Sequence, residues 1–195
     1  LIGPPSSGRT LILDALFEAD KPVVERVYRA SAIKGPSALL SGTSRKEVVK
    51  GATGGLMRKI GRRGILVMKD FTSMLTMNRD ALNETISAFR DIYDGHWSRD
   101  IGSDGGRSLV WDGHVGFLGA CTPALDKHHG VIHELGQRWM YYRYPYSDGF
   151  GESLAVLRHL DFQNVRSEMA SRVRAFVEMI GLEWDMDRRP LTRSE

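Results

Sequence analysis

The segment GPPSSGRT, at residues 3–10, constrains the fold more than any other feature of the sequence. It fits the pattern G-x-x-x-x-G-[KR]-[ST] of a phosphate-binding loop, with arginine at the position where lysine is usual. In such a loop the glycines permit a tight bend in which successive backbone N–H groups point toward an anion. Residues 10–19 predict a helix whose N-terminus would face that anion. The alternative is a Gly/Pro/Ser turn that only begins a helix.

Composition excludes several classes of protein. The 195 residues are 42% hydrophobic and 26% charged, which is typical of a globular domain large enough for one sizeable core. No run approaches the roughly 20 apolar residues of a membrane span. The single cysteine, Cys121, suits a reducing compartment, so we expect a cytoplasmic protein without a membrane partner. The net charge of +3 is only weak evidence for a nucleic-acid partner.

Short apolar runs alternate with helical patterns along the chain. Strands are predicted at residues 23–30, 65–70, 115–122 and 137–145, and helices at 45–60, 79–94 and 124–135. This alternation predicts an α/β fold with a mostly parallel sheet between helices. Further amphipathic helices are predicted beyond residue 151, so we expect a core at 1–145 and a helical lid at 146–195. Because only Leu1 and Ile2 precede the loop, we expect the core to be truncated at its N-terminus.

Two polar residues close predicted buried strands. Asp70 ends the run ILVMKD, and Thr122 ends VGFLGACT. Ligands of open α/β sheets bind outside the carboxyl ends of the strands, where an acid can hold Mg²⁺ and a hydroxyl can reach a terminal phosphate. The alternative for both residues is a helix cap, with Pro123 at the first position of the helix after Thr122.

A hairpin is predicted from residues 97–101 and 107–111, joined by a glycine-rich turn. Trp97 and Trp111 flank its base, and Arg99 and Arg107 flank its tip. This hairpin either contacts nucleic acid or a partner, or is an edge hairpin with solvated arginines.

The order of these elements resembles the AAA+ ATPases, in the branch with a hairpin inserted before the fourth strand. Minichromosome-maintenance helicases and bacterial enhancer-binding activators belong to that branch, and the chain is also similar to helicase-like ATPases of phages and plasmids. The resemblance depends on four motifs, namely GPPSSGRT (3–10), ILVMKD (65–70), VGFLGACTP (115–123) and LGQRWMYYRY (135–144).

The resemblance implies a P-loop NTPase fold with a C-terminal helical lid, and it implies ATP and Mg²⁺ as cofactors. The residues implied to bind the phosphates are Gly3, Pro4, Pro5, Ser6, Ser7, Gly8, Arg9 and Thr10. Thr10 and Asp70 are implied to hold Mg²⁺, and Thr122 to act as the sensor at the fourth strand.

The resemblance also implies arginines that complete the site. Arg138, in the element GQRW, resembles the arginine that reaches into a neighbouring subunit's site, and Arg143 is the second candidate. The alternative for Arg138 is a surface salt bridge. The family's lid arginine corresponds to Arg172 or Arg174. The implied catalytic set is therefore Arg9, Asp70, Thr122 and Arg138.

The expected function is an ATPase motor or remodeller that works as a ring or filament on DNA or a protein partner. Two departures from the family pattern favour an alternative, a nucleotide-binding module with little hydrolysis. Arg9 stands in place of lysine, and Phe71 follows Asp70 where many such ATPases have a catalytic glutamate. A third hypothesis is a DNA-binding structural or regulatory protein that uses the hairpin.

Overall fold

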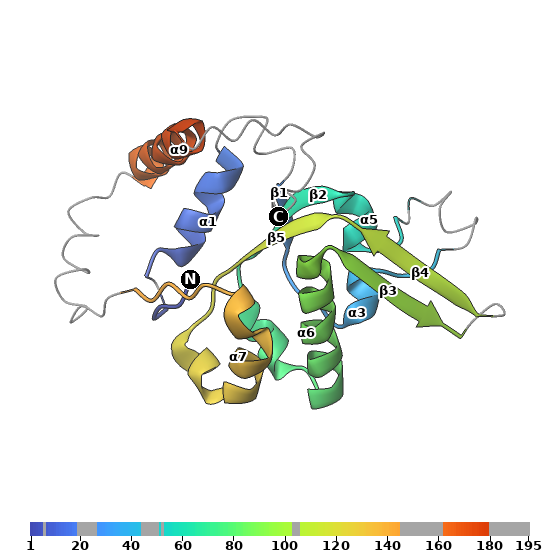
Figure 1. The fold of residues 1–195 in the computed structure, drawn as a ribbon. Coiled ribbons are helices and arrows are strands. Elements are labelled where there is room, and N and C mark those ends of the chain that lie inside the picture. The colour runs from blue at the N-terminus through green and yellow to red at the C-terminus, as the bar shows by residue number, and fades with distance from the viewer. Residues whose placement is uncertain are drawn as a thin grey trace, which may run out of the picture.

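The computed structural model describes residues 1–5, 7–18, 27–43, 51, 53–102, 106–144 and 162–179. A small parallel sheet lies at the centre of the molecule, with the strand order β1-β2-β5 (Figure 1). Its strands are β1 (Val27–Ala30), β2 (Arg63–Met68) and β5 (His114–Gly119). The predicted α/β class with a parallel sheet between helices is confirmed.

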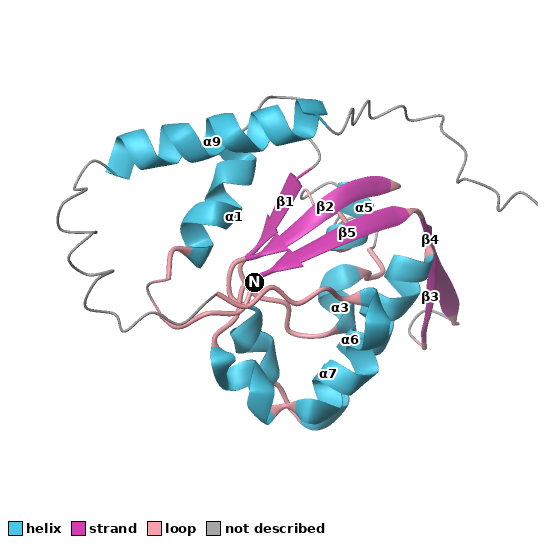
Figure 2. Cartoon of the chain, turned by 60° about the vertical axis from the view of Figure 1, so that its left-hand side comes forward, coloured by secondary structure: helices cyan, strands magenta, loops and turns pink. Residues whose placement is uncertain are grey.

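Helices cover both faces of the sheet (Figure 2). One face carries α1 (Arg9–Glu18) and α9 (Phe162–Met179), and the other carries α3 (Pro36–Leu39), α6 (Arg79–Asp94) and α7 (His129–Leu135). Side chains of a strand alternate between the two faces. Accordingly Val67 packs with Leu13 of α1, whereas its neighbours Leu66 and Met68 belong to the larger core with α6. Each face of the sheet therefore has its own apolar core.

The carboxyl edge of the sheet is extended by two further segments. Ile2 forms parallel bridges with Cys121 on one side and Arg143 on the other. Its N–H donates to the carbonyl of Tyr142 at 2.8 Å, and its carbonyl accepts from the N–H of Tyr144 at 2.9 Å. Across this edge the order is β1, β2, β5, Ile2, Arg143.

The long helix α6 begins and ends as its sequence predicts. The side chain of Asn78 accepts a hydrogen bond from the N–H of Ala81 at 2.8 Å, which caps the N-terminus. Gly95 ends the helix in the left-handed conformation, with φ of 99°.

The predicted hairpin is also confirmed. It consists of β3 (His96–Ile101) and β4 (Arg107–Asp112), with Trp97 directly opposite Trp111. Both indoles are buried, and Nε1 of Trp111 donates to the carbonyl of Gly61 at 2.8 Å. The hairpin projects from the end of the sheet opposite to the helix α1 (Figure 1).

Of the helix predicted at residues 45–60, the described part confirms only the C-terminal end. Only α5 (Leu56–Ile60) is helical, because Gly54 and Gly55 adopt positive φ angles of 81° and 103° that end any continuous helix. Residues 44–50 and 52 lie outside the described residues, as do 23–26 of the first predicted strand, 145–161 and 180–195. The short helix α3, which follows Gly35, was not predicted.

Three other boundaries differ from the prediction. The strand predicted at 65–70 ends at Met68 and is followed by a 3₁₀ helix, η1 (Phe71–Thr76). The helix predicted at 124–135 is divided into the 3₁₀ helix η2 (Pro123–Lys127) and α7. The strand predicted at 137–145 is wrong, because η3 (Gly136–Arg138) is followed by an extended segment that bridges to Ile2 only at Arg143. No helix in the described ranges is long and apolar enough to cross a membrane.

Candidate functional site

The glycine-bounded loop leaves the sheet from the position between Cys121 and Arg143. The N–H of Gly3 donates to the carbonyl of Cys121 at 3.2 Å, and the N–H of Ser7 donates to the carbonyl of Pro4 at 3.3 Å. The loop then reverses at Gly8, whose φ of 74° favours glycine, and α1 begins at Arg9. Ser6 lies outside the described residues, and Pro5 is exposed.

Gly3 is required by close packing. A Cβ atom at this position would lie 2.7 Å from Oγ of Ser7 and 3.1 Å from Cδ2 of Tyr144. Oγ of Ser7 is buried and has no hydrogen-bond partner in the described part of the chain. The loop is therefore closely packed around Gly3.

A pocket of about 440 Å³ adjoins the end of the loop. The loop and the first turn of α1 form one wall, with Gly8, Arg9 and Thr10, and α9 contributes Gln163 and Arg166. Among the described residues, neither Arg9 nor Arg166 has an ion-pair partner. Two guanidinium groups from segments far apart in the sequence thus border one pocket at a helix N-terminus, an arrangement that favours an anion.

Asp14 is the acidic side chain among the described residues that line this pocket, and its charge is balanced. Its Oδ1 lies 2.5 Å from Nζ of Lys69 and 3.2 Å from Nη2 of Arg29. The Arg29 guanidinium also lies over the ring of Phe17, 3.8 Å from its centre. Because Asp14 is already paired with two cations, it does not cancel the attraction of Arg9 and Arg166 for an anion.

Asp70 and Thr122 lie at the same edge of the sheet as the loop. Asp70 follows the end of β2 and is exposed, and Thr122 follows β5 and is half-buried. The capping alternative is confirmed in position, since each residue is the N-cap of a 3₁₀ helix and Pro123 begins the helix after Thr122, but neither side chain accepts a hydrogen bond from that helix. Parallel strands bring their carboxyl ends to one edge, so both side chains remain available there. Neither residue lines the pocket beside Arg9.

Phe71, immediately after Asp70, is part of the core. It is buried, its ring centre lies 5.9 Å from that of Trp139, and its N–H donates to the carbonyl of Ala120 at 2.8 Å. The position at which many AAA+ ATPases have a glutamate therefore points into an aromatic cluster.

Arg138 makes a salt bridge within its own chain. Its guanidinium donates twice to the carboxylate of Asp94, at 3.0 Å from Nε and 2.8 Å from Nη2. This hydrogen bonding lowers the pKa of Asp94 and raises the pKa of Arg138. The salt-bridge alternative is thus present, with both groups largely exposed at the end of α6.

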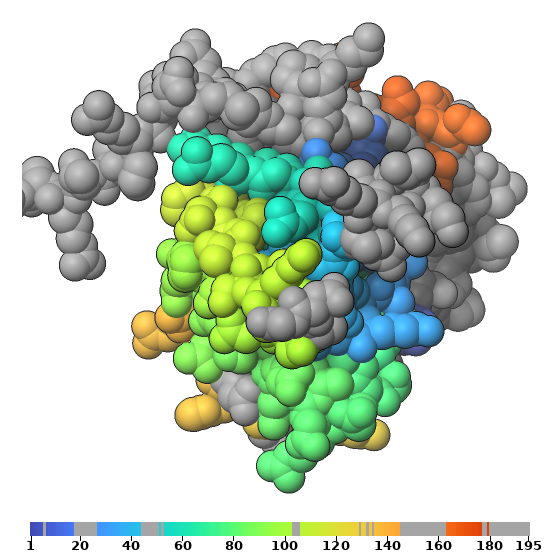
Figure 3. Space-filling view, turned by 90° about the vertical axis from the view of Figure 1, so that its right-hand side faces the viewer, coloured from blue at the N-terminus to red at the C-terminus, as the bar shows by residue number. Residues whose placement is uncertain are grey.

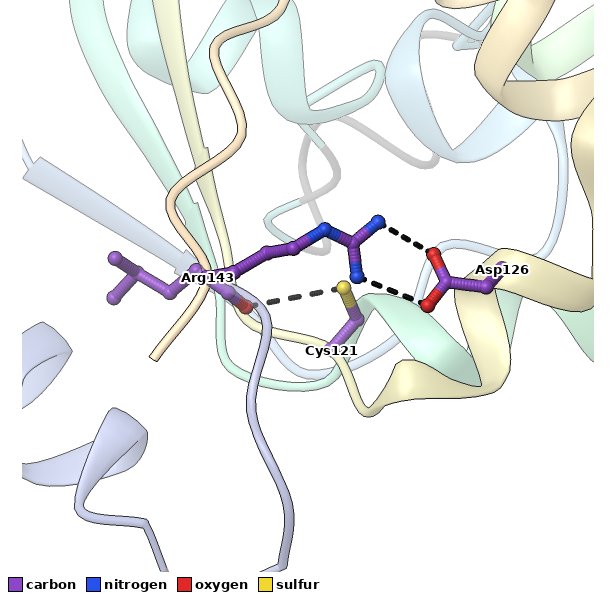
Figure 4. Close-up of polar contacts among 4 residues, drawn as sticks. Cys121, Asp126 and Arg143 are labelled. Atoms are coloured by element: carbon purple, nitrogen blue, oxygen red, sulfur yellow. Dashed lines mark hydrogen bonds and ion pairs between the residues drawn. The ribbon is translucent and has the colours of Figure 1, made fainter. Parts of the chain in front are cut away.

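Arg143, the second candidate, is also paired. Its side chain passes over Cys121 to the carboxylate of Asp126, with hydrogen bonds of 2.9 and 2.6 Å (Figure 4). Burial raises the pKa of the Cys121 thiol, while the nearby charges of Arg9 and Arg143 lower it to a lesser degree. The Arg143 side chain therefore lies beside Cys121, at the base of the loop (Figure 4).

The lid arginines implied by the family do not reach the pocket. Arg172 donates to Glu168 on the same helix, and Arg174 is exposed. Arg166 borders the pocket instead, one turn after Gln163. Sequence reasoning missed Arg166 because the helical pattern does not reveal which turn of α9 packs beside the loop.

The hairpin offers little positive charge. Arg99 turns inward, where its Nη1 donates to the carbonyl of Leu40 at 3.2 Å. In Figure 3 the hairpin, in yellow-green, borders the blue segment that includes this carbonyl. Arg107 is exposed, but so are Asp100 and Asp112, which contact Ser108 and His96 respectively.

A second hollow, of about 480 Å³, lies between β5 and residues 137–141. Its lining is largely apolar and includes Phe117 and Trp139, whose stacked rings have centres 5.8 Å apart. Beside it Met140 is 97% exposed and Tyr93 is 50% exposed. The sequence predicted a strand at residues 137–145, and this apolar surface was not predicted.

Comparison with known proteins finds neither a protein-family model nor a curated protein that matches the chain.

Proposed function

We propose that the chain binds a nucleoside triphosphate with Mg²⁺ at residues 3–10, and that it is an AAA+-like P-loop ATPase. The order of segments across the sheet edge carries this proposal. Ile2, which leads into the loop, lies between Cys121 and Arg143 and is parallel to both. The loop therefore begins beside the end of β5, one strand away from the end of β2.

This order supports the roles of the two polar strand ends. Thr122 follows the segment next to Ile2, where a hydroxyl can reach a terminal phosphate, and Asp70 follows the next strand. A carboxylate that lies one strand away from the strand next to the loop suits a magnesium ion held partly through water. Thr10, in the first turn of α1, would supply the second oxygen ligand.

The charges around the loop support an anionic ligand. Arg9 and Arg166 border the pocket at the N-terminus of α1, and the backbone N–H groups of that terminus add a partial positive charge. Arginine in place of lysine keeps the charge and can bind two phosphate oxygens at once.

The motor or remodeller activity, on DNA or on a protein partner, is part of the same proposal, as is a homo-oligomer whose site is completed by Arg138. The guanidinium of Arg138, which is paired with Asp94 at the end of α6, could instead contact a neighbouring subunit's phosphates. Such an arginine contributes about 10³–10⁵ in rate.

Nucleotide binding is the first test. We expect a fluorescent ATP analogue to bind with Mg²⁺ and Arg9→Ala to weaken binding at least about tenfold, since one charged hydrogen-bond pair contributes about 1.5–3 kcal/mol. The control is Arg58→Ala, an exposed arginine on α5 that does not line the pocket. Absence of binding by the unaltered chain, or equal binding by both variants, would contradict the proposal.

A nucleotide-binding module with little hydrolysis is the second candidate, and the burial of Phe71 favours it. With that side chain in the core, the position after Asp70 supplies no base to orient water. Phosphate release measured at saturating ATP distinguishes the two candidates. Tight binding without release supports the module, and sustained release supports the ATPase.

A further inference from the structure

The buried carboxylate of Asp14 connects the helix of the loop to the central sheet. Its side chain is 12% exposed, and it lies 2.5 Å from the ammonium of Lys69, which is 34% exposed. Arg29 of β1 contacts the same oxygen at 3.2 Å from a more exposed position. This contact set lies on the face of the sheet covered by α1.

Each residue of the Asp14–Lys69 pair is close in sequence to one of the two proposed magnesium ligands. Asp14 follows Thr10 by four residues on α1, so their side chains share one face of the helix. Lys69 directly precedes Asp70, and the distance between adjacent Cα atoms is fixed at about 3.8 Å. The pair is therefore a direct polar link between the helix of Thr10 and the strand end of Asp70.

We propose that Asp14 and Lys69 are positioning residues for the metal half of the site. Their ion pair holds the Thr10 helix at a fixed distance from Asp70, so that a hydroxyl and a carboxylate meet one Mg²⁺. This inference rests on the proposed nucleotide site. Groups that orient metal ligands from outside the coordination sphere commonly change metal affinity about 10–100-fold when they are replaced.

Arg29 provides a matched control. It contacts the same carboxylate oxygen, but it lies on β1, which among the described strands pairs with β2 and is farther from the loop than β2 is. Replacing either cation removes one charge from Asp14 and leaves the other. A purely structural role of the network predicts similar effects of both replacements on nucleotide binding.

The experiment measures the affinity of the chain for a fluorescent ATP analogue with Mg²⁺ and with EDTA. The ratio of the two affinities reports the metal contribution. We expect Lys69→Met to lower this ratio about tenfold or more with little change in EDTA, whereas Arg29→Met keeps the ratio of the unaltered chain. Lys69→Arg, which keeps the charge, is expected to restore most of the ratio.

Thermal unfolding of each variant is measured as well, to show whether the variant is folded. If Lys69→Met does not fold, Asp14→Asn tests the pair from its other side and is expected to lower the ratio equally. The inference is overturned if Lys69→Met keeps the ratio, or if Arg29→Met lowers it as much. Failure of the proposed function is a different result, namely that the unaltered chain binds no nucleotide or binds it without any effect of Mg²⁺.

Discussion

Arg138 and Asp94 meet at the end of α6 in a two-point contact, with both guanidinium donors on the one carboxylate. If Arg138 acts on a neighbouring subunit's nucleotide, Arg138→Ala will lower ATP turnover about a thousandfold, at the lower end of the effect known for such arginines, while nucleotide affinity persists. Asp94→Asn is the matched control, because it weakens the same contact but keeps the arginine. The turnover of both variants is measured as phosphate release across a range of protein concentrations. Equal turnover in the two variants contradicts the shared site.

The Cys121 thiol is expected to be unreactive in the folded chain. Burial raises its pKa, so the folded state favours the neutral thiol. Its contribution to stability is complete below the ordinary thiol pKa of about 8.5 and is lost as pH rises through the raised value. We expect iodoacetamide to modify Cys121 at least about tenfold more slowly in native protein than in urea at pH 7.5. Mass spectrometry measures the rate, and equal rates in the two states would contradict the burial of this thiol.

Gly113, between β4 and β5, is expected to be intolerant of a side chain. A Cβ atom there would overlap the carbonyl oxygen of Arg62 and lie 2.7 Å from Cζ2 of Trp111, so either the backbone or a buried indole must move. We expect Gly113→Ala to lower the free energy of unfolding by about 1–3 kcal/mol. Gly102→Ala is the control, because its Cβ would meet no described atom within 4 Å. Urea unfolding of both variants measures the difference in their free energies of unfolding. Equal values would contradict the close approach of Gly113 to Arg62 and Trp111.

A DNA contact by the hairpin would depend on Arg107, because Arg99 is directed inward. Each phosphate contact changes the slope of log affinity against log salt by about 0.9 for a duplex. We therefore expect Arg107→Ala to reduce that slope by about one and Arg99→Ala to leave it unchanged. Titrations of duplex DNA at several salt concentrations measure the slopes. An unchanged slope in Arg107→Ala would exclude this hairpin as the contact.

Local signals predicted much of the fold. The cap at Asn78, the left-handed Gly95 and the facing indoles of Trp97 and Trp111 all depend on residues close in sequence. The segment after Gly136 was predicted wrongly, because its aromatic residues favour a strand. In the structure Trp139 packs with Phe89, Phe117 and Phe71 and does not pair with a strand of the sheet.

In the candidate site, too, the features that depend on neighbouring residues could be predicted, and the contacts between distant residues could not. The motif at residues 3–10 marks the loop, and the apolar run before Asp70 marks a strand end. The pairing of Asp14 with Lys69 could not be predicted, since an acid on a helix is usually solvated and its two partners are distant in sequence, with Arg29 on β1 and Lys69 just after β2. Arg166 was missed for a similar reason, because its place depends on how α9 packs against α1.

Arg166 is expected to be the α9 arginine that strengthens binding of the triphosphate. It borders the pocket with Arg9, has no ion-pair partner among the described residues, and can turn toward an anion without breaking a salt bridge. We expect Arg166→Ala to weaken ATP binding about tenfold, and AMP binding much less, because a guanidinium contributes most where phosphate charge is greatest. Arg174→Ala, on the same helix and outside the pocket, is the control. Calorimetric titrations with both nucleotides check this. An equal loss for ATP and AMP would instead show that α9 packs against α1 without contacting the phosphates.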